Sequence, residues 1–132
     1  MKQLVLDTHT LVWYLEDNPN LPLAPKTEIE DLDNRIIISI MVLLEMKYFH
    51  RKKRFKISPD VVFENLENDS RCLFYPIDLD VVAELPVNLN IHDAVIVATA
   101  RIFEKFHYPD GEVYVLTKDE EIIKSKLIKT IW

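Results

Sequence analysis

Residues 90–100 read NIHDAVIVATA, and the rest of the chain is organised around them. Within Ala94–Ala100 only Thr99 is polar, and a helix that is apolar on all sides belongs in the middle of a fold. Asp93 is expected on the first turn of this helix, where the positive end of the helix dipole favours a negative charge. Helix capping, with Asn90 as N-cap residue, is the simplest explanation of this acid. Three other acids in similar positions favour a functional role.

The composition is that of a single globular domain spanning residues 1–132. With 48% hydrophobic and 29% charged residues, the chain is long enough for one core and too short for two. Its one cysteine, Cys72, excludes an internal disulfide framework and fits a reducing compartment. The N-terminus reaches Asp7 after three apolar residues, unlike a signal peptide, and no apolar stretch approaches the roughly 18 residues of a membrane span. We therefore expect a cytoplasmic protein with no membrane partner.

The net charge of −6 and the single glycine narrow the classes of function. The negative charge argues against binding nucleic acid through a general positive field. It does not exclude a nuclease, because a carboxylate site repels phosphate only until divalent cations fill it. One glycine in 132 residues leaves no Gly-rich phosphate loop, which excludes nucleotide-dependent enzymes of the P-loop and dinucleotide-binding kinds.

Apolar strands and helices alternate along the chain. The predicted strands cover residues 4–6, 35–39, 72–77, 113–116 and 127–132. The predicted helices cover residues 8–16, 26–32, 40–53, 59–67 and 78–85, and two more begin at Ile91 and at a capping box of Thr117 and Glu120. This alternation indicates an α/β fold with a parallel sheet of four to five strands and helices on both faces.

Glu45 lies inside the predicted helix 40–53. None of its neighbours three or four positions away is basic, so it lacks the usual ion pair along the helix surface. A carboxylate on an apolar face is costly unless something binds it. Either a distant Lys or Arg reaches Glu45, or a metal ion does.

The acids Asp7 and Asp119 both follow strand ends, so a parallel sheet brings them to the same edge. Asp93 opens one helix and Glu45 projects from another. Four converging acids without matched bases repel one another. Oxygen-only ligand sets suit Mg²⁺ or Mn²⁺, and such a site can activate water for attack on a phosphodiester. We therefore predict that these four acids form one metal site.

A basic run, Arg51-Lys52-Lys53-Arg54, closes the predicted helix 40–53. Cations suit a helix C-terminus and stay solvated, which is the simpler interpretation. The alternative is a phosphate-contacting patch beside the site. His92 borders the site and could touch phosphate, but a His at a helix start is more often structural, so we leave it out of the catalytic set.

Four segments in this order resemble a PIN domain: LDTHTLVW at 6–13, Ser39 with Glu45 six residues on, HDAVIVATA at 92–100 and LTKD at 116–119. They resemble in particular the VapC-type toxins of toxin–antitoxin pairs, over nearly the whole chain. The resemblance implies a Rossmann-like parallel sheet and an endoribonuclease (a hydrolase of RNA phosphodiester bonds) that depends on Mg²⁺ or Mn²⁺. It also implies frequent homodimers and inhibition by a small cognate antitoxin.

The resemblance also assigns individual residues of this chain to functional positions of the family. The acidic quartet of the family matches Asp7, Glu45, Asp93 and Asp119, and its hydroxyl positions match Thr8 and Thr117. Many relatives have another Asp three residues before the third acid, where this chain has Asn90. An Asn can orient a water or cap the helix but supplies no charge, so the number of bound metal ions, one or two, stays open. The RNA target, its cleavage site and the antitoxin are not specified by the sequence.

Two other functions stay open at this point. One is a non-catalytic PIN-like module that binds RNA or a protein, although a pure binder has no reason to gather four acids. The other is a phosphoryl-transfer α/β protein with Asp7 as phospho-acceptor. Phosphatases of the Asp-x-Asp type need an acid two residues later, where this chain has His9.

Overall fold

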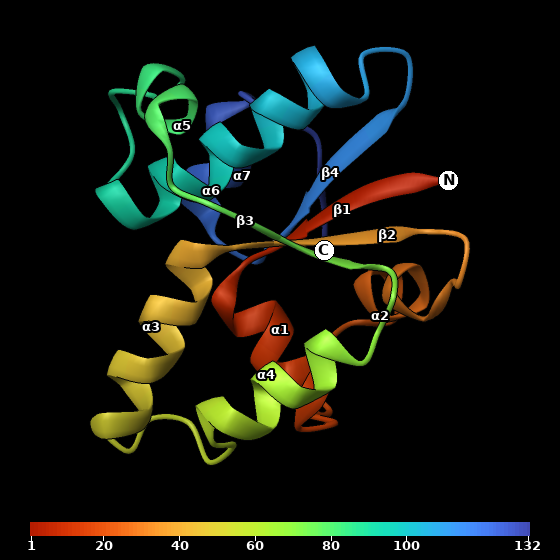
Figure 1. Ribbon diagram of the computed structural model, residues 1–132, viewed down its shortest axis with the longest axis vertical. Helices are drawn as coiled ribbons and strands as arrows, with labels where there is room; N and C mark the ends of the chain where they lie inside the picture. Colours follow the sequence, from red (N-terminus) through yellow and green to blue (C-terminus); the bar gives the residue numbers. More distant parts are fainter.

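The computed structural model describes residues 1–132 and contains one sheet of five parallel strands (Figure 1). The strands are β1 (Lys2–Leu6), β2 (Arg35–Ser39), β3 (Cys72–Tyr75), β4 (Glu112–Leu116) and β5 (Thr130–Ile131). They lie in the order β3-β2-β1-β4-β5, with β1 in the centre and β2 and β4 paired to it on either side. The predicted α/β fold and parallel sheet are confirmed.

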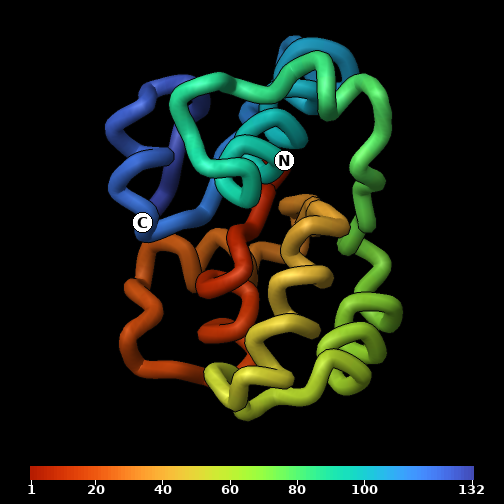
Figure 2. The backbone as a smooth tube through the Cα atoms, turned by 90° about the vertical axis from the view of Figure 1, so that its left-hand side faces the viewer, coloured from red at the N-terminus to blue at the C-terminus, as the bar shows by residue number.

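Helices cover both faces of the sheet. They are α1 (Thr8–Leu15), α2 (Leu23–Glu30), α3 (Ile40–Arg51), α4 (Pro59–Glu67), α5 (Leu79–Ala83), α6 (Ile91–Ile102) and α7 (Glu120–Ser125), with a π-helical turn, η1 (Phe103–His107), directly after α6. In Figure 1, α1, α3 and α4 lie on one side of the sheet, and α5, α6 and α7 on the other. Figure 2 shows α1 and α3 side by side, with α6 above them. None of the helices has the length and apolarity that a bilayer crossing requires.

The segment Ala94–Ala100 of α6 lies in the interior of the protein, as its sequence predicts. All residues of Ala94–Ala100 are buried, and the hydroxyl of Thr99 donates to the carbonyl of Val95 at 2.8 Å, which satisfies its polar group. Ile96 and Val97 belong to the main core with the buried strands β1, β2 and β4. Truncating Ile96 to Ala at such a site would cost about 2–5 kcal/mol. This packing fixes the first turn of α6, and with it Asp93.

Several predicted boundaries are wrong by a few residues. β3 ends at Tyr75, before Pro76, which has no N–H to give to a sheet. β5 is confined to two residues, because residues 127–128 form a bend after α7 has ended at its C-cap residue Lys126. The predicted capping box of Thr117 is also wrong. The N-cap residue of α7 is Asp119, because the Thr117 hydroxyl is engaged with other groups.

Candidate active site

A cleft of about 490 Å³ lies at the carboxyl edge of the sheet. Its lining includes all four predicted acids together with Thr8 and Asn90: it comprises Asp7, Thr8, His9, Glu45, Phe49, Asn90, His92, Asp93, Ile96, Lys118 and Asp119. The acids come from four separate parts of the chain. The strand ends, the start of α6 and one face of α3 therefore meet where the sequence predicts.

Asp7 is the most firmly held of the acids and is only 8% exposed. It follows β1 and caps α1, with Oδ1 accepting from the backbone N–H of Thr10 at 2.8 Å. Its Oδ2 accepts a short hydrogen bond from the hydroxyl of Thr117. Because Leu6 pairs with Leu116 in the sheet, Asp7 and Thr117 leave adjacent strands side by side.

Thr117 connects the first and last acids. Its side chain is fully buried, and besides donating to Asp7 its Oγ1 accepts from the backbone N–H of Asp119 at 3.0 Å. Asp119 in turn accepts from the N–H of Ile122 at 3.1 Å and so begins α7. Thr117 therefore lies beneath the cleft as a positioning residue rather than in its lining.

Asp93 is held by Asn90. The Asn90 side-chain oxygen accepts from the N–H of Asp93 at 3.0 Å, and its Nδ2 donates to Asp93 Oδ2 at 2.7 Å. One amide thus caps α6 and orients the carboxylate. Burial raises the pKa of Asp93, and the negative charges of Asp119 and Asp7 raise it further, against the hydrogen bond from Asn90.

Glu45 projects from α3 toward the start of α6. Thr8 Oγ1 donates to its Oε1 at 3.2 Å, and His92 Nδ1 lies 3.5 Å from its Oε2. The sequence predicts a distant Lys or Arg, or a metal ion, at this carboxylate. In place of a Lys or Arg, the structure has a His and a Thr there. Burial raises the pKa of Glu45, although His92 and Thr8 pull it down.

The cleft is chemically suited to a divalent cation. Its four acids offer carboxylate oxygens as metal ligands, and these carboxylates have lone pairs beyond those used by the hydrogen bonds above. Burial and mutual repulsion raise the pKa of Asp93, and a cation would relieve both effects. No three His, Cys, Asp or Glu side chains lie close enough together to form a finished ligand cage. Cation binding would therefore require the carboxylates to draw closer together.

Sequence reasoning missed four residues that line the cleft: His9, Phe49, Ile96 and Lys118. It also set His92 aside, although His92 touches Glu45. His92 and Lys118 each directly precede a predicted ligand in the sequence, and this adjacency was the available signal. His9 on α1, Phe49 on α3 and Ile96 on α6 reach the cleft through the packing of their helices.

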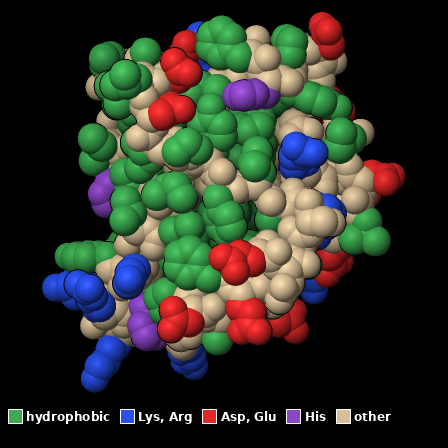
Figure 3. Space-filling view, in the orientation of Figure 1, with side chains coloured by type: hydrophobic (Ala, Val, Ile, Leu, Met, Phe, Trp, Pro, Cys, Tyr) green, Lys and Arg blue, Asp and Glu red, His purple; other side chains and the backbone are tan.

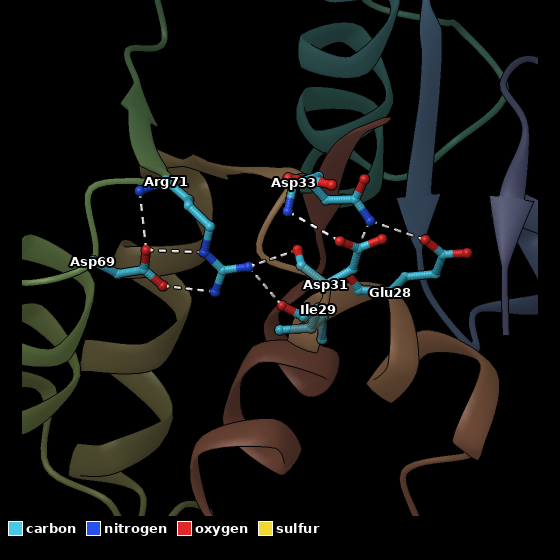
Figure 4. A network of polar contacts seen from close by, with 7 residues as sticks. Glu28, Ile29, Asp31, Asp33, Asp69 and Arg71 are labelled. Atoms are coloured by element: carbon cyan, nitrogen blue, oxygen red, sulfur yellow. Dashed lines mark hydrogen bonds and ion pairs between the residues drawn. The ribbon is translucent and has the colours of Figure 1, made fainter. Parts of the chain in front are cut away.

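A larger hollow of about 610 Å³ lies elsewhere on the surface, and its lining includes Asp69 and Arg71. Figure 4 shows the polar contacts of these two side chains. The Arg71 guanidinium donates to Asp69 Oδ2 at 2.9 Å and to the carbonyls of Ile29 and Asp31 at 2.8 and 3.0 Å. The hydrogen bond from Arg71 lowers the pKa of Asp69, and the bonds from Arg71 to the two carbonyls tie the start of β3 to the end of α2. Because Arg71 and Asp69 are paired with each other and Arg71 also holds backbone carbonyls, we assign these two side chains a structural role.

Comparison with known proteins agrees with this geometry. A family model described as the PIN domain matches residues 4–125. The structure of VapBC2 from Rickettsia felis bound to a DNA fragment from their promoter is 18% identical, with a TM-score of 0.66, over 97% of this chain and 96% of that one. The structure of DNA-bound VapBC from Salmonella typhimurium is 17% identical, with a TM-score of 0.62, over 98% and 97%. No curated protein matches significantly. Because the PIN-domain model matches nearly the whole length of this chain, the chain belongs to the PIN-domain family.

Proposed function

We propose that this PIN domain is a metal-dependent endoribonuclease and the toxin of a toxin–antitoxin pair. The observation that carries the proposal is the gathering of Asp7, Glu45, Asp93 and Asp119 around one cleft at the carboxyl edge of the sheet. In open α/β sheets this edge is where ligands bind. A cleft with so many acids repels a phosphodiester unless a cation accompanies it.

The four acids would hold Mg²⁺ or Mn²⁺, which would supply positive charge at the phosphate and lower the pKa of a water. The chain's own residues prepare the carboxylates for this. Thr117 and the start of α1 fix Asp7, so its position costs little on binding. Asn90 orients Asp93, and Thr8 with His92 holds Glu45. Asn90 adds no charge of its own, which favours one firmly held ion over two.

The proposed partners follow from the likeness to VapBC structures and from the resemblance described above. We infer that a small antitoxin covers the cleft, that the protein acts in the cytoplasm on RNA, and that it forms homodimers. An antitoxin that brings positive charge into the acidic cleft would take the place of the cation.

The test is cleavage of a mixed pool of structured RNAs by the purified, antitoxin-free protein. It is run with EDTA, with Mg²⁺ and with Mn²⁺, for the wild type, for Asp93→Asn and for Asp110→Asn, a control in an exposed loop. We expect cutting only with metal, lost in Asp93→Asn and kept in Asp110→Asn. Cutting that persists in EDTA and in Asp93→Asn would overturn the proposal. A folded protein that binds RNA but never cuts it would support a non-catalytic module instead.

A further inference from the structure

A second pocket, of about 330 Å³, adjoins the acidic cleft. His9, Phe49 and Lys118 line both hollows, so the two lie side by side. The remaining lining of the second pocket consists of Val12, Trp13, Glu16, Asn18, Arg54, Phe55 and Lys56. Its character is opposite to that of the cleft, because aromatic rings and cations dominate it. We call it the aromatic–basic pocket.

The rings of this pocket form one connected cluster. Phe55 stands edge-to-face with His9 at 5.7 Å between centroids and with Phe49 at 5.6 Å. His9 also meets Trp13 edge-on at 6.3 Å, and Trp13 lies 6.0 Å from Trp132. His9 and Trp13 come from α1, Phe49 from α3 and Phe55 from the loop after α3. These four rings line the pocket and none of them is fully buried, so each keeps apolar surface that a partner could cover.

Two of the three cations of this pocket lie over aromatic rings, and none of the three pairs with a carboxylate. Lys118 Nζ lies 4.5 Å from the centroid of Trp13, and the Arg54 guanidinium carbon lies 5.3 Å from that of Phe49. None of the ion pairs in the structure involves Lys118, Arg54 or Lys56, although the chain has 22 acids. Figure 3 shows Lys and Arg side chains gathered at the lower left, where α3 ends. Lys118, Arg54 and Lys56 are therefore free to bind an anion from outside the protein.

Single-stranded nucleic acid is recognised by this combination, with cations along the backbone and aromatic rings against the bases. We infer that the aromatic–basic pocket binds one nucleotide of single-stranded RNA, next to the phosphodiester in the acidic cleft. The inference rests on the proposed ribonuclease function and adds to it how the substrate is held. A base entering the pocket would replace the Lys118 ammonium on Trp13, and the ammonium would turn to the phosphate.

Glu16 gives the bound nucleotide a direction. It lines the same pocket, and its Oε1 is buried without a hydrogen-bond donor. A carboxylate suits the N–H groups on a base edge and repels a phosphate. The base therefore faces Glu16, and the phosphate faces Arg54, Lys56 and Lys118. An acidic peptide would use the same cations but would lack the stacking base and the donors for Glu16.

Fluorescence of Trp13 tests this inference without requiring cleavage. In a Trp132→Phe background Trp13 is the single tryptophan, because the chain has only two. The full chain is titrated in Mg²⁺ with a 2′-O-methylated oligoadenylate hexamer, whose integrity is checked on a gel. The matched probe is an abasic hexamer of equal charge. We expect the hexamer with bases to quench Trp13 emission and the abasic hexamer to bind more weakly without quenching.

Variants in the pocket should change this binding in two separable ways. Phe55→Leu removes a ring and should raise the Kd about five- to 150-fold, the usual range for one stacked base. Arg54→Gln/Lys56→Gln should reduce the slope of log affinity against log salt by about 1.4, or 0.7 per phosphate contact. Phe106→Leu and Lys105→Gln/Lys124→Gln, which are exposed and outside the pocket, should change neither quantity. Circular dichroism verifies that each variant is folded.

The outcomes separate this inference from the proposed function. Metal-dependent RNA cleavage with a Kd and salt slope unchanged in both pocket variants would overturn the pocket and leave the nuclease standing. Quenching by the hexamer that Phe55→Leu weakens, without any cleavage, would support the pocket and overturn the nuclease. Equal quenching by the abasic hexamer or by an oligoglutamate peptide would show a general anion site and overturn the inference.

Discussion

The hydroxyl of Thr117 should be worth more than those of Thr10 and Thr99, which are equally buried, because Thr117 donates to a carboxylate and the other two donate to backbone carbonyls. Thr117→Val keeps the side-chain shape and removes the donor to Asp7 Oδ2, in a position with no exposed surface. Hydrogen bonds to charged groups contribute about 1.5–3 kcal/mol, and a buried carboxylate left without its donor costs a similar amount. The N–H of Asp119 also loses its acceptor, but Asp119 is partly exposed, so water replaces it. We therefore expect a loss of about 2 kcal/mol of unfolding free energy.

The matched control is Thr99→Val. Thr99 is equally buried, but its hydroxyl donates to the Val95 carbonyl of its own helix, a neutral partner. Its loss should cost about 1 kcal/mol or less. Urea unfolding of the metal-free proteins measures the difference, and Mn²⁺ titration measures the second effect. Because Thr117 orients Asp7 and Asp119, its removal should weaken Mn²⁺ binding about 10–100-fold. Equal stability of the two variants with unchanged Mn²⁺ affinity would refute the reasoning.

Two further expectations concern the acidic cleft, and a third concerns Cys72 at the start of β3. Burial raises the pKa values of Asp93 and Glu45 in the fold, so the metal-free protein should lose stability as pH rises above the ordinary carboxyl pKa of about 4. Thermal melts across pH should show this loss. At pH 7, addition of Mg²⁺ or the substitution Glu45→Gln should restore the stability. Asn90→Asp keeps the N-cap and adds a negative charge, so calorimetry should show tighter Mn²⁺ binding. Thermal melts of the metal-free variant should show lower stability. Unchanged Mn²⁺ affinity would mean that Asn90 is remote from the ion. Burial raises the pKa of the Cys72 thiol to about 11, so iodoacetamide at pH 8 should modify it far more slowly than it modifies free cysteine, as mass spectrometry would measure.

The sequence predicts the fold and the meeting of the acids for one physical reason. In a parallel sheet every strand ends at the same edge, so acids that follow strand ends must come together even when the strand order is unknown. Asp7 and Asp119 are placed by this rule, because β1 and β4 are neighbours in the sheet. Asp93 is placed by the buried helix that follows it, since α6 has no polar face to turn outward.

Contacts between distant segments were not predictable in this way. The N-cap of α7 moved from Thr117 to Asp119 because the Thr117 hydroxyl binds Asp7, 110 positions earlier in the chain. The pairing of Glu45 with His92 depends on how α3 and α6 pack, which local patterns do not encode. The aromatic–basic pocket unites Trp13, Phe55 and Lys118 from three segments, and each residue alone reads as ordinary core or surface.

Binding of Mn²⁺, followed by loss of the free-ion signal in electron paramagnetic resonance, tests the central claim that the four acids form one metal site. The wild type is titrated beside Asp7→Asn, Asp93→Asn and the exposed-loop control Asp110→Asn, without RNA and without any need for cleavage. We expect the wild type and Asp110→Asn to bind Mn²⁺ equally, with Mg²⁺ competing, and the two site variants to bind more than about tenfold more weakly. Equal Mn²⁺ binding by all four folded proteins would contradict the account.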